Sequence, residues 1–364
     1  MGKKMIMHIV GNRPQFIKLA ALEQEIRKRG YEQIIVHTGQ HYDKNMSDIF
    51  FDELQICKPT VNLGVGSGSH GQMTGKAIIS IEQVIEEYRP KCVILYGDTD
   101  STLAGAIATS KMDIPIIHVE AGVRTGSRNN PEEINRIVTD HISTLLFCAD
   151  RMGVANLEKE GLKENAYFVG DLMFDTFINN RDRMESNTLC NYNLKRKEYV
   201  LMTWHRQENT SSANRMLQIL DFIKKVDCNV ICPLHPRTRK KLEEYSLDKV
   251  AQEIQNLRFI EPVGYLEMIE LMVNSRMILT DSGGVSKESY FAGVKCIQMF
   301  DWTIWPDLEE INWIYKADFD NDLKGALEFI NEGGMCNEED CTDFYGDGTA
   351  SVKIVDILEK ENMI

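Results

Sequence analysis

The stretch 114–143, IPIIHVEAGVRTGSRNNPEEINRIVTDHIS, decides the fold of this chain. It starts with a short apolar run of the kind found in buried strands, which ends at His118 and Glu120. A loop of Gly, Arg and Asn follows, and Pro131, Glu132 and Glu133 then open a helix, since proline is accepted in a first turn and acids favour the positive end of a helix. The stretch therefore predicts a strand, a loop rich in ionisable groups, and a helix. The two glutamates either serve this local preference alone or belong to a site that moves protons.

The same alternation continues on both sides of this stretch. KMIMHIV (4–10) precedes FIKLAALEQEIRKRG (16–30), and KCVILYG (91–97) precedes STLAGAIATSKM (101–112). Strands that are apolar along their whole length are typical of parallel sheets with helices on both faces. We therefore predict an α/β protein of doubly wound, Rossmann-like type.

The pattern pauses once, in the polar and aperiodic segment 179–198, and strand-like runs resume at YVLMTWH (199–205). A chain of 364 residues is also longer than one ordinary core requires. We predict an N-terminal domain over residues 1–171, a linker region over 172–197 and a C-terminal domain over 198–364, whose last helix packs back on the N-terminal domain. Two such domains would face each other across a cleft.

Composition excludes several classes of function. The formal net charge of −14 argues against a nucleic-acid binder. No apolar run has the length of a bilayer span, and the start MGKKMIMHIV leads directly into a strand, so we expect a cytoplasmic protein without a membrane partner. Most of the nine cysteines lie in strand-like runs such as KCVILY, which predicts small buried thiols. Neither Cys228 with Cys232 nor Cys336 with Cys341 has zinc-site spacing, so no metal is expected.

Polar residues follow several predicted strands directly. Asp98, Glu120, His205 and Ser282 each lie just past the end of an apolar run. Ligands of doubly wound sheets bind beyond the carboxyl ends of the strands, so these residues are candidates for one site.

DSGGVSKES (281–289) carries a possible anion site. Ser282, Gly283 and Gly284 lie between a strand and a helix, where free backbone amides favour a phosphate, although an ordinary turn capped by serine fits equally well. Glu288, one turn later, either accepts hydrogen bonds from ribose hydroxyls or is a solvated helix residue.

The first loop and a glycine-rich segment offer further candidates. In GNRPQFIK (11–18), Arg13 and Lys18 suit contacts to phosphate, although Arg13 could be a simple surface residue. GVGSGSHG (64–71) matches a dinucleotide fingerprint only superficially, because no strand and ribose-binding acid accompany it, and we interpret it as a flexible loop.

Two histidines are candidates. His205, followed by Arg206 and Glu208 in TWHRQENT (203–210), can hold or move a proton, or it bridges the two domains. His118 lies inside a strand, and a hydrogen-bonded structural role is favoured over catalysis.

Taken together, seven motifs resemble the non-hydrolysing UDP-N-acetylglucosamine 2-epimerase family. They are GNRPQFIK, TGQHYDKNMSDIFFDEL, GDTDSTLAGAIA, HVEAGVRT, PEEINRIVTDHIS, TWHRQENT and DSGGVSKES, in this order over residues 8–310. The resemblance implies two Rossmann-like domains in the GT-B arrangement, a UDP-sugar substrate, a homodimer, and no metal or nicotinamide cofactor. It also implies epimerisation at C2 of a UDP-2-acetamido sugar, by loss of UDP to a 2-acetamidoglucal-type intermediate and its return, for surface-polysaccharide precursors.

The resemblance assigns roles to individual residues. It implies catalytic groups at Asp98, Glu120, Glu132 and His205. It implies UDP contacts at a second set, with weaker support for the two arginines at its end: Arg13, Ser282, Gly283, Gly284, Glu288, Arg136 and Arg206.

The chain departs from the family pattern in three places. The family usually opens GTRPE, whereas this chain has Asn12 and Gln15. Gln15 also occurs in members that resemble UDP-2,3-diacetamido-2,3-dideoxyglucuronate 2-epimerases. Where members typically carry an arginine and a Thr-Glu pair, FDWTIWPDLEE (300–310) has Phe300 and Ile304, which favours a modified sugar. Members that need an activating sugar nucleotide carry a second glutamine three residues after the one that matches Gln40. Here that position is Asp43, so we expect hyperbolic kinetics without an activator.

Three rival functions stay open on the sequence. A hydrolysing epimerase would release UDP and free sugar, a GT-B glycosyltransferase would transfer the sugar, and a silent binder would do neither. Retention of all four proton-handling candidates weighs against the silent binder.

Overall fold

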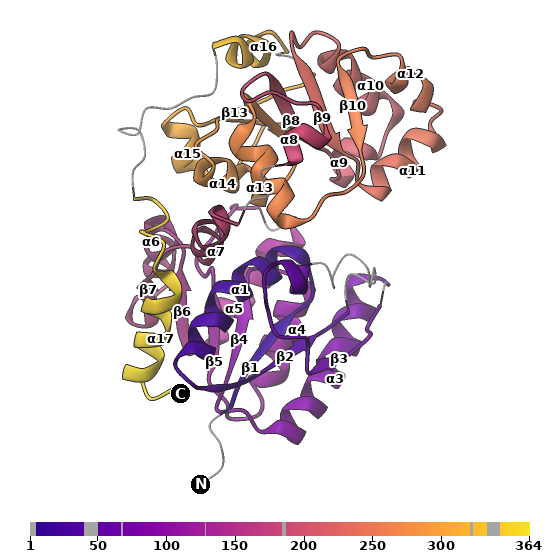
Figure 1. Ribbon diagram of the computed structural model, residues 1–364. Coiled ribbons are helices and arrows are strands. Elements are labelled where there is room, and N and C mark those ends of the chain that lie inside the picture. Colours follow the sequence, from indigo (N-terminus) through magenta and orange to yellow (C-terminus); the bar gives the residue numbers. More distant parts are fainter. Residues whose placement is uncertain are drawn as a thin grey trace. The chain divides into compact units, whose positions relative to one another are not determined.

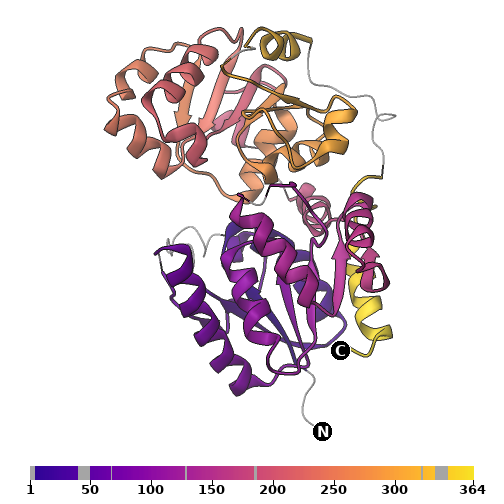
Figure 2. The same ribbon diagram turned by 180° about the vertical axis from the view of Figure 1, so that it is seen from behind.

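The computed structural model describes residues 5–39, 50–66, 68–127, 129–183, 187–320, 323–332 and 343–364. The chain folds into two compact units (Figures 1 and 2). The first comprises Met1–Asn180 with Asp343–Ile364, and the second comprises Arg181–Thr342.

The first unit is a parallel sheet covered by helices. Its elements in chain order are β1 (Met5–Val10), α1 (Arg13–Lys28), β2 (Glu32–His37), β3 (Val61–Asn62), α3 (His70–Tyr88), β4 (Cys92–Tyr96), α4 (Asp100–Thr109), β5 (Ile116–Val119), α5 (Pro131–Ile142), β6 (Leu145–Cys148), α6 (Arg151–Lys159), a 3₁₀ turn (Lys163–Asn165), β7 (Ala166–Phe168), α7 (Leu172–Arg181) and α17 (Ala350–Lys360). The sheet order is β3-β2-β1-β4-β5-β6-β7, and the paired strands are parallel. The connections run in one direction from β1 and in the other from β4, so the switch point lies between β1 and β4.

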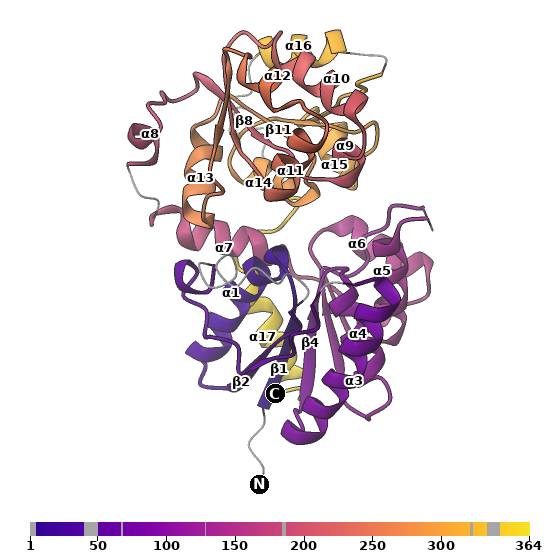
Figure 3. The ribbon, with the colours of Figure 1, turned by 90° about the vertical axis from the view of Figure 1, so that its right-hand side faces the viewer.

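Helices cover both faces of this sheet. Helices α1 and α17 lie on one side, and α3, α4 and α5 lie side by side on the other (Figure 3). Helix α1 starts where it does because Asn12 and Gln15 form a capping box. The first residues of α17 are tied to α7, because Asp175 of α7 accepts the amides of Ala350 (3.0 Å) and Ser351 (2.7 Å). The last helix therefore belongs to the first unit.

The second unit repeats the scheme. Its elements are α8 (Thr188–Asn191), β8 (Tyr199–Thr203), α9 (Gln207–Thr210), α10 (Ala213–Ile223), β9 (Asn229–Pro233), α11 (Pro236–Glu244), α12 (Asp248–Gln252), β10 (Leu257–Ile260), α13 (Tyr265–Asn274), β11 (Met277–Thr280), α14 (Gly283–Phe291), β12 (Cys296–Gln298), α15 (Pro306–Glu310), β13 (Ile314–Lys316) and α16 (Leu323–Glu332). The parallel sheet order is β10-β9-β8-β11-β12-β13, with the switch point between β8 and β11. The prediction of two doubly wound, Rossmann-like units is thereby confirmed.

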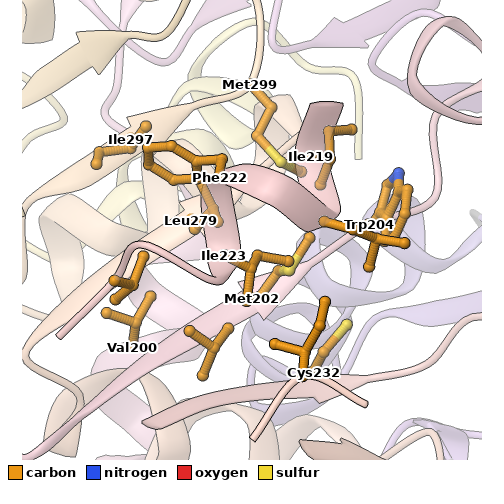
Figure 4. Close-up of a cluster of buried hydrophobic side chains, with 14 of the residues drawn as sticks. Val200, Met202, Trp204, Ile219, Phe222, Ile223, Cys232, Leu279, Ile297 and Met299 are labelled. Atoms are coloured by element: carbon orange, nitrogen blue, oxygen red, sulfur yellow. The ribbon is translucent and has the colours of Figure 1, made fainter. Parts of the chain in front are cut away.

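A large apolar cluster holds one face of the second sheet (Figure 4). Met202 and Leu279 from the strands meet Ile219 and Phe222 of α10, and all four are fully buried. The apolar strands read from the sequence thus become the core that fixes the strand ends.

Several other expectations meet the structure here. Residues 172–197, expected as a linker, contain α7 and α8, because Leu172, Met173 and Phe177 are buried. Cys92, Cys148, Cys232 and Cys296 are buried as predicted, and burial raises the pKa of Cys92 to about 12. Cys336 and Cys341 lie outside the described residues.

The described part of the chain has neither a membrane-spanning helix nor a metal-binding cluster. No helix in it combines the length and apolar character of a membrane span. No group of three or more His, Cys, Asp or Glu in it is arranged to hold a metal ion.

Candidate functional site

The carboxyl edge of the first sheet, beside its switch point, carries two of the predicted acids. Strands β4 and β5 are hydrogen-bonded neighbours, so Asp98 and Glu120, which follow them, lie at the same edge of the sheet. Ligands of doubly wound sheets bind at this edge.

Each of these two acids forms an ion pair with a basic side chain from a helix. Lys18 of α1 forms a hydrogen-bonded ion pair with Glu120, and Arg136 of α5 forms one with Asp98. The lysine and arginine side chains are almost buried, whereas Asp98 keeps 28% of its side chain exposed. Burial alone would lower the pKa of Arg136, but the charges of Asp98 and Glu120 outweigh it, and the pKa is raised. The carboxylates are therefore held by basic side chains at the edge where a ligand would bind.

The backbone at Glu120 adopts a conformation that costs energy. Its φ is +67°, in the left-handed region, which a residue other than glycine occupies at a cost of about 1–3 kcal/mol. Gly97, opposite it, is also left-handed, and a Cβ there would lie 3.2 Å from the Lys18 Nζ and 3.3 Å from Glu120 Oε2. The pair of Lys18 and Glu120 thus occupies the space that the glycine leaves.

The two glutamates at the start of α5 behave differently. Glu133 is buried and accepts the amides of Thr125 (2.9 Å) and Gly126 (3.0 Å). Glu132 is exposed, and its carboxylate makes no hydrogen bond to any residue that the structure describes. Local helix preference and loop anchoring therefore account for Glu133, whereas Glu132 is available to a ligand.

The loop after β1 carries one partly exposed candidate residue and one buried residue. Arg13 is partly exposed, and its guanidinium lies 4.8 Å from the ring centre of Phe50. Gln15 is buried, donates to the Tyr96 carbonyl (2.7 Å) and accepts the Gly11 amide (2.6 Å). The side chain of Gln15 therefore stabilises the loop through hydrogen bonds to the backbone and is not directed toward a ligand.

The second unit carries His205 at the end of β8. The buried carboxylate of Asp281, just past β11, accepts the amides of His205 and Arg206, and one of its oxygens lies 3.2 Å from His205 Nδ1. No hydrogen bond to the other ring nitrogen comes from a residue that the structure describes, which leaves that nitrogen for a ligand. The ring of His235 lies 5.6 Å from that of His205, centre to centre.

The DSGG turn opens helix α14. Ser282 is its N-cap and accepts the Val285 amide at 3.3 Å, as an ordinary cap does. Gly283 and Gly284 start the helix, and their amides carry the positive end of its dipole. Glu288 is buried, so the interpretation as a solvated helix residue is wrong.

Residues 300–305 lie beside this turn, as expected. The Trp305 indole donates to the Gly283 carbonyl (2.7 Å), and a Cβ on Gly283 would lie 2.9 Å from Ile304. The Arg206 guanidinium lies 5.4 Å from the ring centres of both Phe300 and Trp302. The aromatic loop and the arginine after His205 therefore form one surface.

Sequence reasoning missed three buried anchors, Glu133, Asp140 and Asp281. Each binds backbone amides of a loop that carries a predicted site residue. Asp281 stood in the DSGG motif, but its role depends on β8 and β11 being neighbours. Gln40 and Asp43 lie outside the described residues.

The family model and the relatives that match this chain agree with one another and cover nearly all of it. Residues 24–359 match the family model of UDP-N-acetylglucosamine 2-epimerase. A UDP-N-acetylglucosamine 2-epimerase homolog of Methanococcus maripaludis is 45% identical over 97% of this chain and 99% of its own. UDP-2,3-diacetamido-2,3-dideoxy-D-glucuronate 2-epimerase of Pseudomonas aeruginosa is 42% identical over 98% of this chain and 99% of its own.

A solved structure agrees with both units. The UDP-GlcNAc 2-epimerase of Methanocaldococcus jannaschii, in complex with UDP-GlcNAc and UDP, matches with a TM-score of 0.89. Its sequence is 36% identical, and the match covers 98% of this chain and 99% of that one.

Proposed function

Because this chain belongs to the UDP-N-acetylglucosamine 2-epimerase family, an isomerase family, we propose that it inverts C2 of a UDP-2-acetamido sugar and returns the product attached to UDP. The observation that carries the proposal is the pair of acids at the strand ends of the first unit, each held by a cation, with exposed Glu132 on the next helix. Such groups suit a reaction that moves protons and passes through a cation.

The order of steps follows from the chemistry of the sugar. The hydrogen on C2 is not acidic, because C2 carries an amide nitrogen and no neighbouring carbonyl. The C1–O bond therefore breaks first, and its electron pair leaves with UDP. The resulting oxocarbenium-like sugar loses its C2 proton to a base and becomes a 2-acetamidoglucal. Protonation on the opposite face and return of UDP to C1 give the epimer without any net oxidation.

The acids take the roles that this sequence of steps requires. Two faces need two proton-handling groups, and a developing cation favours carboxylates nearby. We assign Asp98 as a proton carrier and Glu120 and Glu132 as acid–base or electrostatic groups at the sugar. Lys18 and Arg136 hold two of these carboxylates in place and offer positive charge to phosphate.

The nucleotide contacts fall mainly on the second unit. We assign His205 to stabilise the departing diphosphate, because Asp281 fixes its ring and leaves one nitrogen available. The amides at Gly283 and Gly284 suit phosphate. The remaining proposed contacts are Arg13, Arg206 and Ser282 to UDP, and Glu288 to the ribose.

Two rival reactions differ in the fate of UDP. A hydrolysing epimerase would let water capture the intermediate and release free sugar, and a glycosyltransferase would pass the sugar to an acceptor. The paired acids favour epimerisation over transfer, because a transferase has no need of several proton carriers around C2.

One experiment separates these reactions. The protein is incubated in deuterated water with a panel of UDP-2-acetamido sugars, and the products are analysed by NMR. We expect deuterium at C2 and product still attached to UDP. Product without deuterium rules out the proposed steps, free sugar with UDP indicates hydrolysis, and a new glycoside indicates transfer.

We also propose a cytoplasmic homodimer that makes precursors of surface polysaccharides. The support for a dimer is the exposed isoleucines Ile79 and Ile134, which are 59% and 47% exposed on α3 and α5, the helices on either side of α4. Sedimentation in solution tests the oligomeric state, and a monomer at micromolar concentration would contradict it.

A further inference from the structure

A buried carboxylate lies beneath the loop that carries Glu120. Asp140 of α5 is fully buried, and its Oδ1 lies 2.6 Å from His118 Nδ1. Its Oδ2 accepts the amide of Gly122 (3.2 Å) and lies 2.7 Å from the Arg124 guanidinium. Asp140 thus contacts the chain two residues before Glu120 and two residues after it.

His118 extends this contact to the neighbouring strand. Its Nε2 lies 2.7 Å from the carbonyl oxygen of Gly97, the residue before Asp98. Carbonyl and carboxylate oxygens only accept hydrogen bonds, so both ring nitrogens of His118 donate when Asp140 is ionised. Burial alone would raise the pKa of Asp140, but the charges of His118 and Arg124 lower it. The buried His118 and Asp140 therefore form a bridge between the loops that carry the two candidate acids.

The loops that this bridge joins are conformationally demanding. Gly97, Glu120 and Gly122 all have φ in the left-handed region, at +61°, +67° and +82°. A Cβ at Gly122 would lie 2.3 Å from the carbonyl oxygen of Gly153, so only glycine fits there. Glu120 is not a glycine, so its left-handed backbone conformation is strained and needs contacts on both sides to persist.

We propose that Asp140 is a positioning residue, which acts through His118 and the Gly122 amide to hold Glu120 and Asp98 in one fixed arrangement. The proposal rests on the proposed function in so far as these two acids act on the sugar. Asp140 itself is fully buried, so it touches no substrate.

The test compares two isosteric substitutions of buried aspartates. Asp140→Asn keeps the shape but turns one acceptor into a donor, which then faces the donors of His118 or of Gly122 and Arg124. We expect kcat to fall about a hundredfold, as for a small misplacement of reacting groups, while KM and the Kd for UDP change by less than about threefold.

Asp175→Asn is the matched control. Asp175 is equally buried and also accepts backbone amides, but those belong to α17. Its substitution should lower the thermal midpoint and leave kcat of the folded protein unchanged. Equal kcat values for Asp140→Asn and Asp175→Asn would overturn the proposal.

Two substitutions of His118 test the bridge itself, also if Asp140→Asn does not fold. The amide nitrogen of His118→Asn takes the place of Nδ1 and keeps the contact to Asp140, whereas that of His118→Gln takes the place of Nε2 and keeps the contact to Gly97. Each variant breaks one arm, so we expect each to lower kcat at least about tenfold with KM retained. Wild-type kcat in either variant would contradict the bridge.

Amide hydrogen exchange separates this inference from the proposed function, because it needs no substrate. Peptides that cover residues 96–98 and 118–126 should exchange faster in Asp140→Asn than in Asp175→Asn. Faster exchange together with an inactive wild type would contradict the proposed reaction and support the bridge. Unchanged exchange, with an active wild type and an active Asp140→Asn, would contradict the bridge alone.

Discussion

At the scale of single residues, two neighbouring glutamates show what a sequence can and cannot reveal. Glu132 and Glu133 have the same chemistry and both suit the start of a helix. The structure separates them, because the helix turns Glu133 toward the loop amides and leaves Glu132 in solvent. Residue type and place in the helix do not distinguish the two, and on the sequence only the family resemblance singled out Glu132. The anchoring role of Glu133 depends on the position of the loop, which the sequence does not specify.

This difference predicts opposite effects of two identical substitutions. Glu132→Gln should lower kcat roughly a hundredfold or more, as for a lost acid, base or charge stabiliser, without changing the unfolding midpoint. Steady-state kinetics and thermal unfolding measure both effects. Glu120→Gln is expected to act in the same way on kcat. Near-normal turnover in both variants would remove these role assignments.

Glu133→Gln should mainly affect stability, and the effect should depend on pH. Burial alone would raise the pKa of Glu133, but the amides of Thr125 and Gly126 lower it. A carboxyl group with a lowered folded pKa stabilises the fold above its unfolded pKa of about 4.3, and this contribution is lost as pH falls through the folded value. Urea unfolding at pH 7 should show a loss of about 1–3 kcal/mol in Glu133→Gln, and a smaller loss near pH 3. A loss that grows on acidification would contradict the assignment.

At the scale of elements, apolar strands and the residues after them were predictable, and the short edge strand β13 was not. The runs at β1, β4, β5, β8 and β11 are buried on both faces, so their sequences are continuous apolar stretches. Strand β13 has three residues at the sheet edge and no comparable signal. Contacts such as Asp281 with His205 arise from strand order, which periodicity alone does not give.

The loop of residues 300–305 predicts the sugar preference. Its aromatic and aliphatic side chains lie beside the turn at Gly283, where Trp302 and Ile304 are partly exposed and Phe300 is buried. Phe300 and Trp302 stack with ring centres 5.2 Å apart. An apolar surface favours a deoxygenated or N-acylated sugar, because a buried hydroxyl without a partner costs about 1–3 kcal/mol. We therefore expect a higher kcat/KM for a diacetamido or 6-deoxy UDP-2-acetamido sugar than for UDP-N-acetylglucosamine. If the plain sugar is turned over at least as well as every modified one, the loop does not set the specificity.

At the scale of the whole molecule, the chain leaves the first unit near residue 180 and returns to it at residue 343. Ile354, Val355 and Leu358 of α17 are fully buried there, and α17 packs against α1. Ion pairs from Arg29 to Asp356 (2.7 Å) and Glu359 (3.2 Å) lie at the partly exposed margin of this contact and contribute little beside the buried side chains. Apolar burial by the last helix is therefore what ties the end of the chain to the first unit.

This topology predicts that a change in the last helix destabilises the first unit and not the second. Ile354→Ala removes a fully buried side chain and should cost about 2–5 kcal/mol, whereas Lys360→Ala, at an exposed position of the same helix, is the control. All four tryptophans, Trp204, Trp302, Trp305 and Trp313, belong to the second unit, so their fluorescence reports that unit alone, while far-UV circular dichroism reports both. In Ile354→Ala the dichroism transition should therefore begin at a lower temperature, and the fluorescence midpoint should stay at the wild-type value. A fluorescence midpoint that falls by as much as the dichroism midpoint would show that the two units unfold as a single cooperative body, and the last helix would then stabilise the whole chain.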